Sequence, residues 1–329
     1  MDRFVQLAIR SLAFTILPVL TLISPSPAVA QKYPSQPVRI VVPFAAGGGT
    51  DVLARTIAHG LSERWGVHVY VDNRPGAGSS TGTDVVAKAA PNGYTLLYTS
   101  PAYAINPTLY QHLPFKQDDL EPVAIVADAP LVLAVHPSIP VNNAKELIAL
   151  LKANPKKYGY ATSGNGSILH MASLLFCSMA DVDVLNVPYR GAAPAMNDVL
   201  SGQVAMIFDQ VSTAAQLIEA KQLKGLAVTT AKRSALLPNV PTLSEQGLTG
   251  YEAYTWNIVL APRGTPPAIV HQLAADLTAV VQSADMKKRL LELGAEVPEP
   301  MPPGAIAAFV AKETEKWGKL VKAAGIQIN

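Results

Sequence analysis

The stretch Val41-Val42-Pro43-Phe44-Ala45-Ala46-Gly47-Gly48-Gly49-Thr50-Asp51 decides the fold that we predict for this chain. It ends a β-branched apolar run that begins at Val38, and it precedes apolar residues at helical spacing, namely Val52, Leu53, Ile57, Leu61 and Trp65. This pattern predicts a buried strand, a glycine-rich loop and a helix that Thr50 or Asp51 can cap. Unpaired amides at such a helix start attract anions. One loop of this kind could equally be a tight turn, but the same pattern recurs along the chain.

The first thirty residues have the features of an export signal. Arg3 and Arg10 are basic, the run from Leu12 to Ile23 is apolar but too short to span a bilayer, and Ala28-Val29-Ala30 resembles a cleavage site. A transit peptide fits less well, because the arginines are few and the apolar run is strong. We therefore expect residues 1–30 to be a signal peptide that is cleaved near Ala30.

Composition limits the classes of function. The 329 residues are 49% hydrophobic, which is enough for two domains with separate cores. Removing Arg3 and Arg10 from 26 basic residues, and Asp2 from 24 acidic ones, leaves a formal charge of +1, which argues against nucleic acid as a partner. We expect the single Cys177 to be a buried thiol in a helix. No metal or cofactor is expected, because five histidines show no metal-ligand spacing: His59, His68, His112, His136 and His271.

Strands and helices alternate after the first loop. A strand over 67–71 leads into the second glycine-rich loop, residues 72–82, and a helix over 84–90 precedes a strand over 94–99 that ends at Ser100. Alternation of this kind predicts a parallel, doubly wound α/β sheet, whose ligands bind at the carboxyl ends of the strands. Both loops and Ser100 fall at such ends.

The pattern continues in a second α/β segment. Prolines near 122 and 130 mark breaks before a strand over 131–135, and a strand over 158–161 leads into the third special loop, Thr162-Ser163-Gly164-Asn165-Gly166-Ser167. Strands over 182–187 and 204–208 end near Tyr189 and at Asp209. A strand over 254–261 and helices over 267–281, 284–293 and 304–324 follow. We predict a first lobe made of 31–130 and 253–329 and a second lobe made of 131–252, joined by a hinge of two crossings.

Several motifs, in this order and spacing, carry a resemblance to a known family. They are Pro43-Phe44…Gly47-Gly48…Asp51, Asn73-Arg74-Pro75-Gly76-Ala77-Gly78, Pro91-Asn92-Gly93-Tyr94, Ser163-Gly164…Gly166-Ser167…His170, Val187-Pro188-Tyr189-Arg190-Gly191 and Leu237-Pro238-Asn239-Val240-Pro241-Thr242. The chain resembles the periplasmic solute-binding proteins of tripartite tricarboxylate transporters, the Bug family, over essentially all of residues 31–329.

The resemblance implies a two-lobed fold of the type II periplasmic-binding-protein kind and no enzymatic activity. It implies a periplasmic protein that closes on a small carboxylate, such as a di- or tricarboxylate, an aromatic acid or an acidic amino acid. Loop amides, hydroxyls and water would hold the carboxylate oxygens. The expected partners are this ligand and the membrane subunits of a transporter, and we expect a monomer. Ala45 and Ala46 stand where family members often carry prolines. This difference leaves the backbone amide donors in place, but it is expected to change the shape of the loop.

We predict ligand contacts from both lobes. The first loop contributes backbone amides to these contacts. The second loop and the strand end at Ser100 form walls of the site, and the third loop contributes hydroxyls. The residues are Phe44, Ala46, Gly47, Gly48, Gly78, Ser79, Ser80, Ser100, Tyr103, Thr162, Ser163, Gly166, Ser167, Tyr189, Arg190 and Asp209.

Each of these residues has a structural alternative. The hydroxyls can cap helices instead of binding a ligand. Arg190 suits either a second carboxylate or an ion pair. For Asp51 we favour a structural role over contact with an ammonium group of the ligand. For His170 we favour a role in the core or as a helix cap.

The rival function is an exported α/β hydrolase. Gly78-Ser79-Ser80-Thr81-Gly82 matches G-x-S-x-G, with Ser80 as nucleophile. A nucleophile elbow needs a strand that runs directly into the serine, whereas Arg74-Pro75-Gly76-Ala77 intervenes here. Dinucleotide binding is disfavoured as well, because Gly76, Gly78 and Gly82 have one residue too many for G-x-G-x-x-G.

Overall fold

The computed structural model describes residues 33–189 and 191–328. The expected signal peptide, residues 1–30, and Arg190 lie outside the described residues. Contacts group Pro34–Asn329 as one unit.

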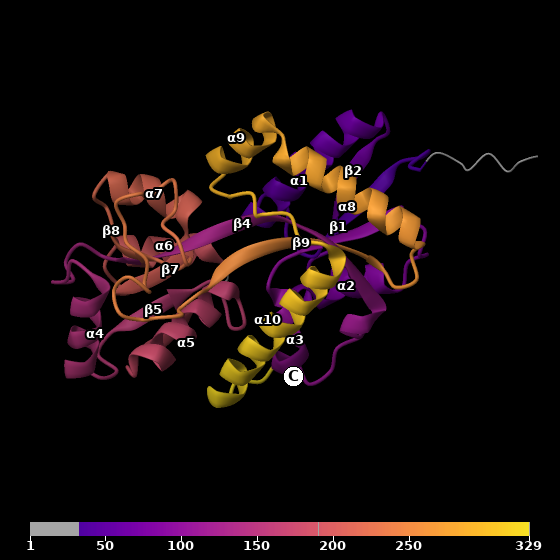
Figure 1. Ribbon diagram of the computed structural model, residues 1–329. Coiled ribbons are helices and arrows are strands. Elements are labelled where there is room, and N and C mark those ends of the chain that lie inside the picture. The colour runs from indigo at the N-terminus through magenta and orange to yellow at the C-terminus, as the bar shows by residue number, and fades with distance from the viewer. Residues whose placement is uncertain (1–32, 190, 329) are drawn as a thin grey trace, which may run out of the picture. The chain divides into compact units, whose positions relative to one another are not determined.

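Among the described residues, nine strands form one mixed sheet (Figure 1). They are β1 (Val38–Val42), β2 (Val69–Asn73), β3 (Thr95–Thr99), β4 (Leu120–Val135), β5 (Gly159–Thr162), β6 (Leu185–Pro188), β7 (Met206–Gln210), β8 (Lys224–Val228) and β9 (Tyr254–Pro262). Their order is β2-β1-β3-β9-β4-β7-β5-β6, and β8 also pairs with β4.

The helices alternate with the strands up to β8. After β9, the chain ends with three consecutive helices. The α-helices are α1 (Gly49–Trp65), α2 (Ser80–Ala87), α3 (Ala102–Leu109), α4 (Ala144–Ala153), α5 (Ile168–Ala180), α6 (Ala192–Leu200), α7 (Val211–Glu219), α8 (Pro267–Gln282), α9 (Ala284–Glu292) and α10 (Pro303–Ala323). Two 3₁₀ turns, η1 (Ala77–Ser79) and η2 (Gln117–Asp119), precede α2 and β4. No helix in the described part of the chain is both long and apolar enough to span a bilayer.

The sheet is only partly parallel. β1 runs parallel to β2 and β3, and β5 runs parallel to β6 and β7, because a helix crosses over between these strands. β9, by contrast, pairs antiparallel with both β3 and β4. The expectation of a parallel sheet therefore holds within each of the two groups and is wrong for β9 and for β4, which connect them through antiparallel pairs.

β4 is much longer than the strand over 131–135 that we predicted. Its first part, up to Pro130, pairs with β9, and from Leu131 onward it pairs with β7 and β8. Pro122 and Pro130 indicated breaks because proline cannot donate to a ladder. The register shifts directly after Pro122, and Pro130 is the last residue that pairs with β9, so the strand continues past both.

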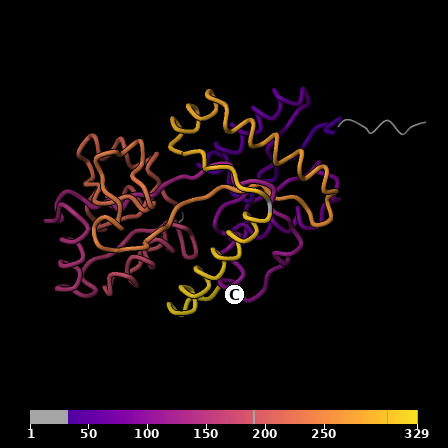
Figure 2. The backbone as a smooth tube through the Cα atoms, viewed as in Figure 1, coloured from indigo at the N-terminus to yellow at the C-terminus, as the bar shows by residue number. Residues whose placement is uncertain are grey.

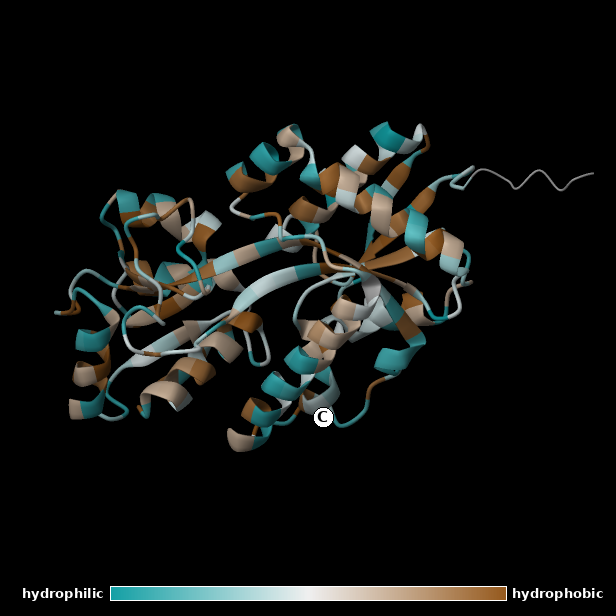
Figure 3. Ribbon diagram, viewed as in Figure 1, coloured by the Kyte–Doolittle hydropathy of each residue, from teal (hydrophilic) through white to brown (hydrophobic). Residues whose placement is uncertain are grey.

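Two backbone segments connect the two groups of strands (Figure 2). One is β4, and the other runs from residue 229 to β9. Figure 3 shows brown, apolar residues concentrated in the strands and teal, polar residues on the outer turns of the helices. The strand residues Val38, Ile40, Val41 and Val42 are fully buried, as the apolar run in the sequence predicts.

Two helices differ from the prediction. α2 begins at Ser80, directly after the second loop, and not at residue 84. α3, which contains Pro107, was not predicted. α3 is an element of the candidate site.

Candidate ligand-binding site

A cavity of about 310 Å³ lies between the first three glycine-rich loops and α3. Among the described residues, no charged side chain lines it. The lining residues are Pro43, Phe44, Ala45, Pro75, Gly76, Gly78, Ser79, Ala102, Asn106, Leu109, Tyr110, Ser163, Gly164, Asn165, Gly166 and Ser167. The loops that the sequence singled out separately therefore meet in one place.

The structure brings six of the predicted contact residues to this cavity: Phe44, Gly78, Ser79, Ser163, Gly166 and Ser167. Ala46, Gly47 and Gly48 lie exposed in the first loop, next to the lining residue Ala45. The full set of contacts remains a prediction.

Apart from Arg190, which lies outside the described residues, the other predicted side chains lie outside the cavity lining and are buried or hydrogen-bonded to protein groups. Ser80 and Ser100 are buried. The remaining hydroxyls and the carboxylate have protein partners: Tyr103 donates to Gln117 O (2.8 Å), Thr162 to Asn186 Oδ1 (3.3 Å), Tyr189 to Asp198 Oδ2 (2.6 Å), and Asp209 Oδ2 accepts from Thr213 (2.7 Å). Burial raises the pKa of Asp209 to about 6, although its hydrogen bonds with Thr213 and the Gln210 amide oppose the shift.

The first loop is held in place by Asp51. Its Oδ2 accepts from the Gly47 amide (2.8 Å) and from Arg55 Nε (3.0 Å), and its Oδ1 accepts from Asn73 Nδ2 (2.8 Å). Asn73 also donates to Phe44 O (3.1 Å), so the end of β2 fixes the loop that follows β1. Burial raises the pKa of Asp51, but the hydrogen bonds from Arg55, Gly47 and Asn73 outweigh it, and the pKa lies below its ordinary value. The Gly47 amide is therefore hydrogen-bonded within the protein, where it stabilises the first loop.

The start of α1 keeps its donors available. Gly48 is the N-cap residue, and no side chain accepts from the first turn. The first amides of a helix have no acceptor within the helix. Within the described chain, no hydrogen bond engages the amides of Ala45 and Ala46 either. At α5, in contrast, Ser167 accepts from the His170 amide (3.2 Å). The unsatisfied donors favour an anion beside α1.

The second loop depends on α3. Ala77, Gly78 and Ser79 all have positive φ, at 43°, 59° and 86°. Such a conformation needs support from its surroundings. Asn106 supplies it, because its Nδ2 donates to Gly78 O (2.7 Å) and lies 3.2 Å from Ser79 Oγ. Tyr110 packs so closely on Gly78 that a Cβ there would collide with its hydroxyl.

The third loop is organised by His170. Its Nδ1 accepts from the Gly166 amide (3.0 Å), so the neutral ring carries its proton on Nε2. Gly166 itself packs against Leu109 of α3. Burial lowers the pKa of His170 to about 4, and protonation of Nδ1 would also break the bond to Gly166. His170 therefore has the structural role that the sequence favoured.

We expect the variant His170→Gln to change the pH dependence of stability. The folded protein binds this proton with a pKa of about 4, whereas the unfolded chain binds it near pH 6.5. Between pH 6.5 and 4 the unfolded state therefore holds more protons, and acid lowers the free energy of unfolding through this residue. Urea unfolding should show the wild type losing about 3 kcal/mol relative to the variant over this range. A pH-independent difference between the two proteins would contradict this.

The comparisons with known proteins agree with this geometry. The family model described as the tripartite tricarboxylate transporter family receptor matches residues 53–326. The chain belongs to this receptor family.

Solved structures of similar proteins are known. A protein of R. palustris with adipate is 37% identical, with a TM-score of 0.80, over 90% of this chain and 99% of that one. The periplasmic binding protein BugD is also 37% identical, with a TM-score of 0.77, over 90% and 99% of the two chains. MatC from Rhodopseudomonas palustris with bound malate is 31% identical, with a TM-score of 0.76, over 88% and 100%.

Family membership decides between the two functions that the sequence left open. The tripartite tricarboxylate transporter receptors are binding proteins and not enzymes, so the hydrolase alternative does not hold. The structure agrees, since Ser80 is buried and its Oγ lies 3.5 Å from an amide, Asn106 Nδ2, which cannot act as a base. Among the described residues, no group of His, Cys, Asp and Glu could hold a metal ion. The family also confirms the two-lobed α/β fold of periplasmic solute-binding proteins.

α3 lines the cavity with Ala102, Asn106 and Leu109, and Tyr110 follows at its C-cap; none of these four was among the predicted contacts. Tyr103, Asn106 and Tyr110 have helical spacing, and this signal could have indicated a helix despite Pro107. Gln210 does not line the cavity, but its contact with the start of α1 was not predicted either. Its side chain packs on Gly49, where an added Cβ would lie 2.8 Å from Gln210 Oε1. The pairing of α1 with β7 is tertiary and has no local signal.

Proposed function

We propose that this receptor captures a small carboxylate, namely a di- or tricarboxylate, an aromatic acid or an acidic amino acid, between two lobes for a tripartite tricarboxylate-type transporter. The observation that carries the proposal is the cavity of about 310 Å³, in which loops from both groups of strands present amides, hydroxyls and side-chain amides. Ligand sites usually measure roughly 300–1,000 Å³, so this cavity suits a small molecule.

Carboxylate oxygens match the donors around the cavity. On one side Ala45 lines the cavity, no described hydrogen bond engages its amide or that of Ala46, and the uncapped start of α1 follows shortly after in the chain. Ser163 and Asn165 of the third loop supply side-chain donors on the other. Adipate and malate in the two similar receptors are both dicarboxylates, which supports this ligand class.

The proposed lobes are residues 31–130 with 253–329, and residues 131–252. In support, β4 changes its pairing partners between Pro130 and Leu131. Glycines mark the places where the lobes touch: Gly166 packs on Leu109, and Gly49 packs on Gln210. Opening of the lobes would separate these pairs, and closure on a ligand would restore the contacts.

Export and assembly complete the proposal. Receptors of this family, such as the periplasmic binding protein BugD, support a location in the periplasm. We propose that residues 1–30 are the signal peptide, with cleavage near Ala30, and that the mature receptor acts as a monomer that delivers its ligand to membrane subunits.

A thermal-shift screen tests the ligand class. The protein is unfolded, refolded to remove any ligand that co-purified, and mixed with mono-, di- and tricarboxylates, aromatic acids and acidic amino acids. Ligand at 100 times its Kd contributes about 2.7 kcal/mol, which should raise the Tm by several degrees. We expect a shift with one class of carboxylate, and p-nitrophenyl ester hydrolysis that is the same in wild type and Ser80→Ala. No shift with any carboxylate, or esterase activity lost in Ser80→Ala, would refute the proposal.

A further inference from the structure

The segment 326–328, which follows α10, lies beside the end of α3 (Figure 1). The amide of Ile328 donates to Leu109 O (2.8 Å), and the carbonyl of Ile328 accepts from the Gln111 amide (3.2 Å). Together these bonds form a parallel bridge between Ile328 and Tyr110. The end of α3 is therefore held by a segment that is distant in the sequence.

The end of α3 depends on this segment because the helix is short and contains a proline. Pro107 lacks the N–H that would pair with Tyr103 O in a regular helix, and Gln117 Nε2 donates to that carbonyl instead (2.9 Å). The last carbonyls of a helix have no partner within it. Leu109 O is one of these, and Ile328 supplies its donor. The backbone of α3 cannot replace this bond.

Two residues at the end of α3 form part of the cavity wall, namely Leu109 and Tyr110. Tyr110 packs on Gly78 of the second loop, and Leu109 packs on Gly166 of the third loop, each so closely that an added Cβ would collide. The Ile328 side chain also reaches the third loop, since its Cδ1 would lie 3.9 Å from a Cβ at Gly166. A shift of the end of α3 would therefore change its contacts with both loops, and with them the shape of the cavity.

We propose that Ile328 is a positioning residue for ligand binding, an inference that rests on the proposed function of the cavity. Its backbone holds the end of α3, and through it Leu109 and Tyr110, at the distance from the second and third loops that the ligand requires. Ile328 itself is not among the lining residues, so it acts on the ligand through these two neighbours. The third loop belongs to the second proposed lobe, and the segment after α10 therefore also takes part in closure of the lobes.

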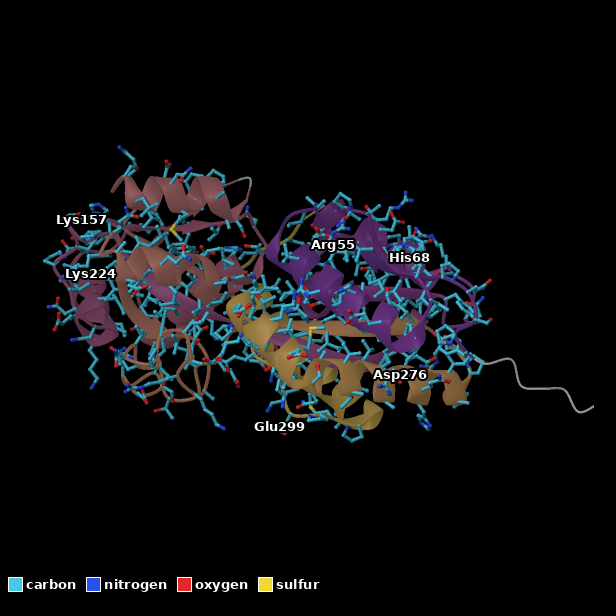
Figure 4. All side chains as sticks on the ribbon, turned by 90° about the horizontal axis from the view of Figure 1, so that it is seen from above. Arg55, His68, Lys157, Lys224, Asp276 and Glu299 are labelled. Carbon is cyan, nitrogen blue, oxygen red and sulfur yellow. The ribbon has the colours of Figure 1, made fainter. Side chains whose placement is uncertain are left out.

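Hydrogen exchange of the ligand-free protein, followed by mass spectrometry, tests whether Ile328 holds α3. Ile328→Pro removes the amide that donates to Leu109 O, whereas Ile328→Val keeps it. Because loss of a hydrogen bond makes local opening easier, we expect peptides that cover α3 and the second loop to exchange about 10-fold faster or more in Ile328→Pro. Ile328→Val should exchange at the wild-type rate. The peptide that contains the exposed Lys157, at the opposite end of the molecule from His68 in Figure 4, is the internal reference and should not change.

Wild-type exchange of α3 in Ile328→Pro would overturn the proposal. Faster exchange in every peptide, including the one that contains Lys157, would show a general loss of stability and would overturn it as well. If Ile328→Pro does not fold, as judged by circular dichroism, a chain that ends at Gln327 lacks both bonds to α3 and is judged by the same criterion. Failure of both variants to fold would show that Ile328 serves the whole fold, which also contradicts the proposal.

Calorimetry then tests the effect on binding, with probes from each class of the thermal-shift screen, namely acetate, malate, adipate, citrate, benzoate and glutamate. We expect the probe that binds the wild type to bind Ile328→Pro at least about 10-fold more weakly, and Ile328→Val as tightly as the wild type. Equal affinity of Ile328→Pro and the wild type would overturn the role of Ile328 alone. Binding of no probe by the wild type would refute the proposed function, and the role of Ile328 with it.

Discussion

An aspartate at position 48 is expected to stabilise the protein and to abolish carboxylate binding. Gly48 is the N-cap of α1, with φ −75° and ψ 164°, a geometry that suits an N-cap side chain, and no side chain accepts there now. A Cβ at this position would meet only Ala45 O, at 3.7 Å. The new carboxylate would accept hydrogen bonds from the first-turn amides, and its negative charge would interact favourably with the positive end of the helix dipole. Together these effects should add about 1 kcal/mol to the free energy of unfolding.

The same carboxylate would occupy the donors that we assign to the ligand and would repel its charge. We therefore expect the affinity for the carboxylate identified by thermal shift to fall about 100-fold or more. Urea unfolding measures the stability, and calorimetry measures the affinity.

Gly48→Asn separates the two effects. Asparagine caps the helix as well as aspartate does but carries no charge, so it should give a similar gain in stability and a smaller loss of affinity. If Gly48→Asp bound its ligand as the wild type does, the first loop would be a turn and not a binding element.

Alanine at Gly82 is expected to be the most destabilising of the substitutions considered. Gly82 lies in α2, where the helix packs on the ends of β1 and β2. An added Cβ would lie 2.7 Å from Arg74 O and 2.8 and 2.9 Å from the Cβ and Cα of Pro43. Backbone and ring atoms of this kind cannot rotate away as the end of a flexible side chain can. We expect a loss of about 3 kcal/mol in the free energy of unfolding, measured by urea denaturation.

Gly304→Ala is the matched control for this clash. Gly304 also lies in a helix, near the start of α10, but nothing stands within 4 Å of an added Cβ. Alanine there should leave stability unchanged or raise it by up to about 1 kcal/mol, because alanine favours helix. If both variants lost stability equally, backbone conformation and not crowding by Pro43 and Arg74 would explain the effect. Carboxylate binding by Gly82→Ala should also weaken, since the first and second loops meet at this point.

The sequence by itself determined the local units of this receptor. Apolar runs and glycines identified the strand, loop and helix around residues 38–65, and the helix predicted over 267–281 is α8, Pro267–Gln282. These signals are local, because helix spacing, strand alternation and loop glycines all act within a few residues. The order of the motifs was sufficient to indicate the family, which the match over 53–326 shows.

Tertiary structure alone decided which groups meet. Antiparallel β9 enters between β3 and β4, and β4 continues through Pro130, because pairing with strands far away in the sequence outweighs the local effect of proline. The structure also shows which donors the loops use themselves: Asp51 accepts from the Gly47 amide and His170 from the Gly166 amide, each from four residues along the chain, and the start of α1 remains open. Asn106 reaches the second loop across 28 residues of sequence. A sequence pattern shows which groups can donate, but only the packed structure shows which of them the protein has left for a ligand.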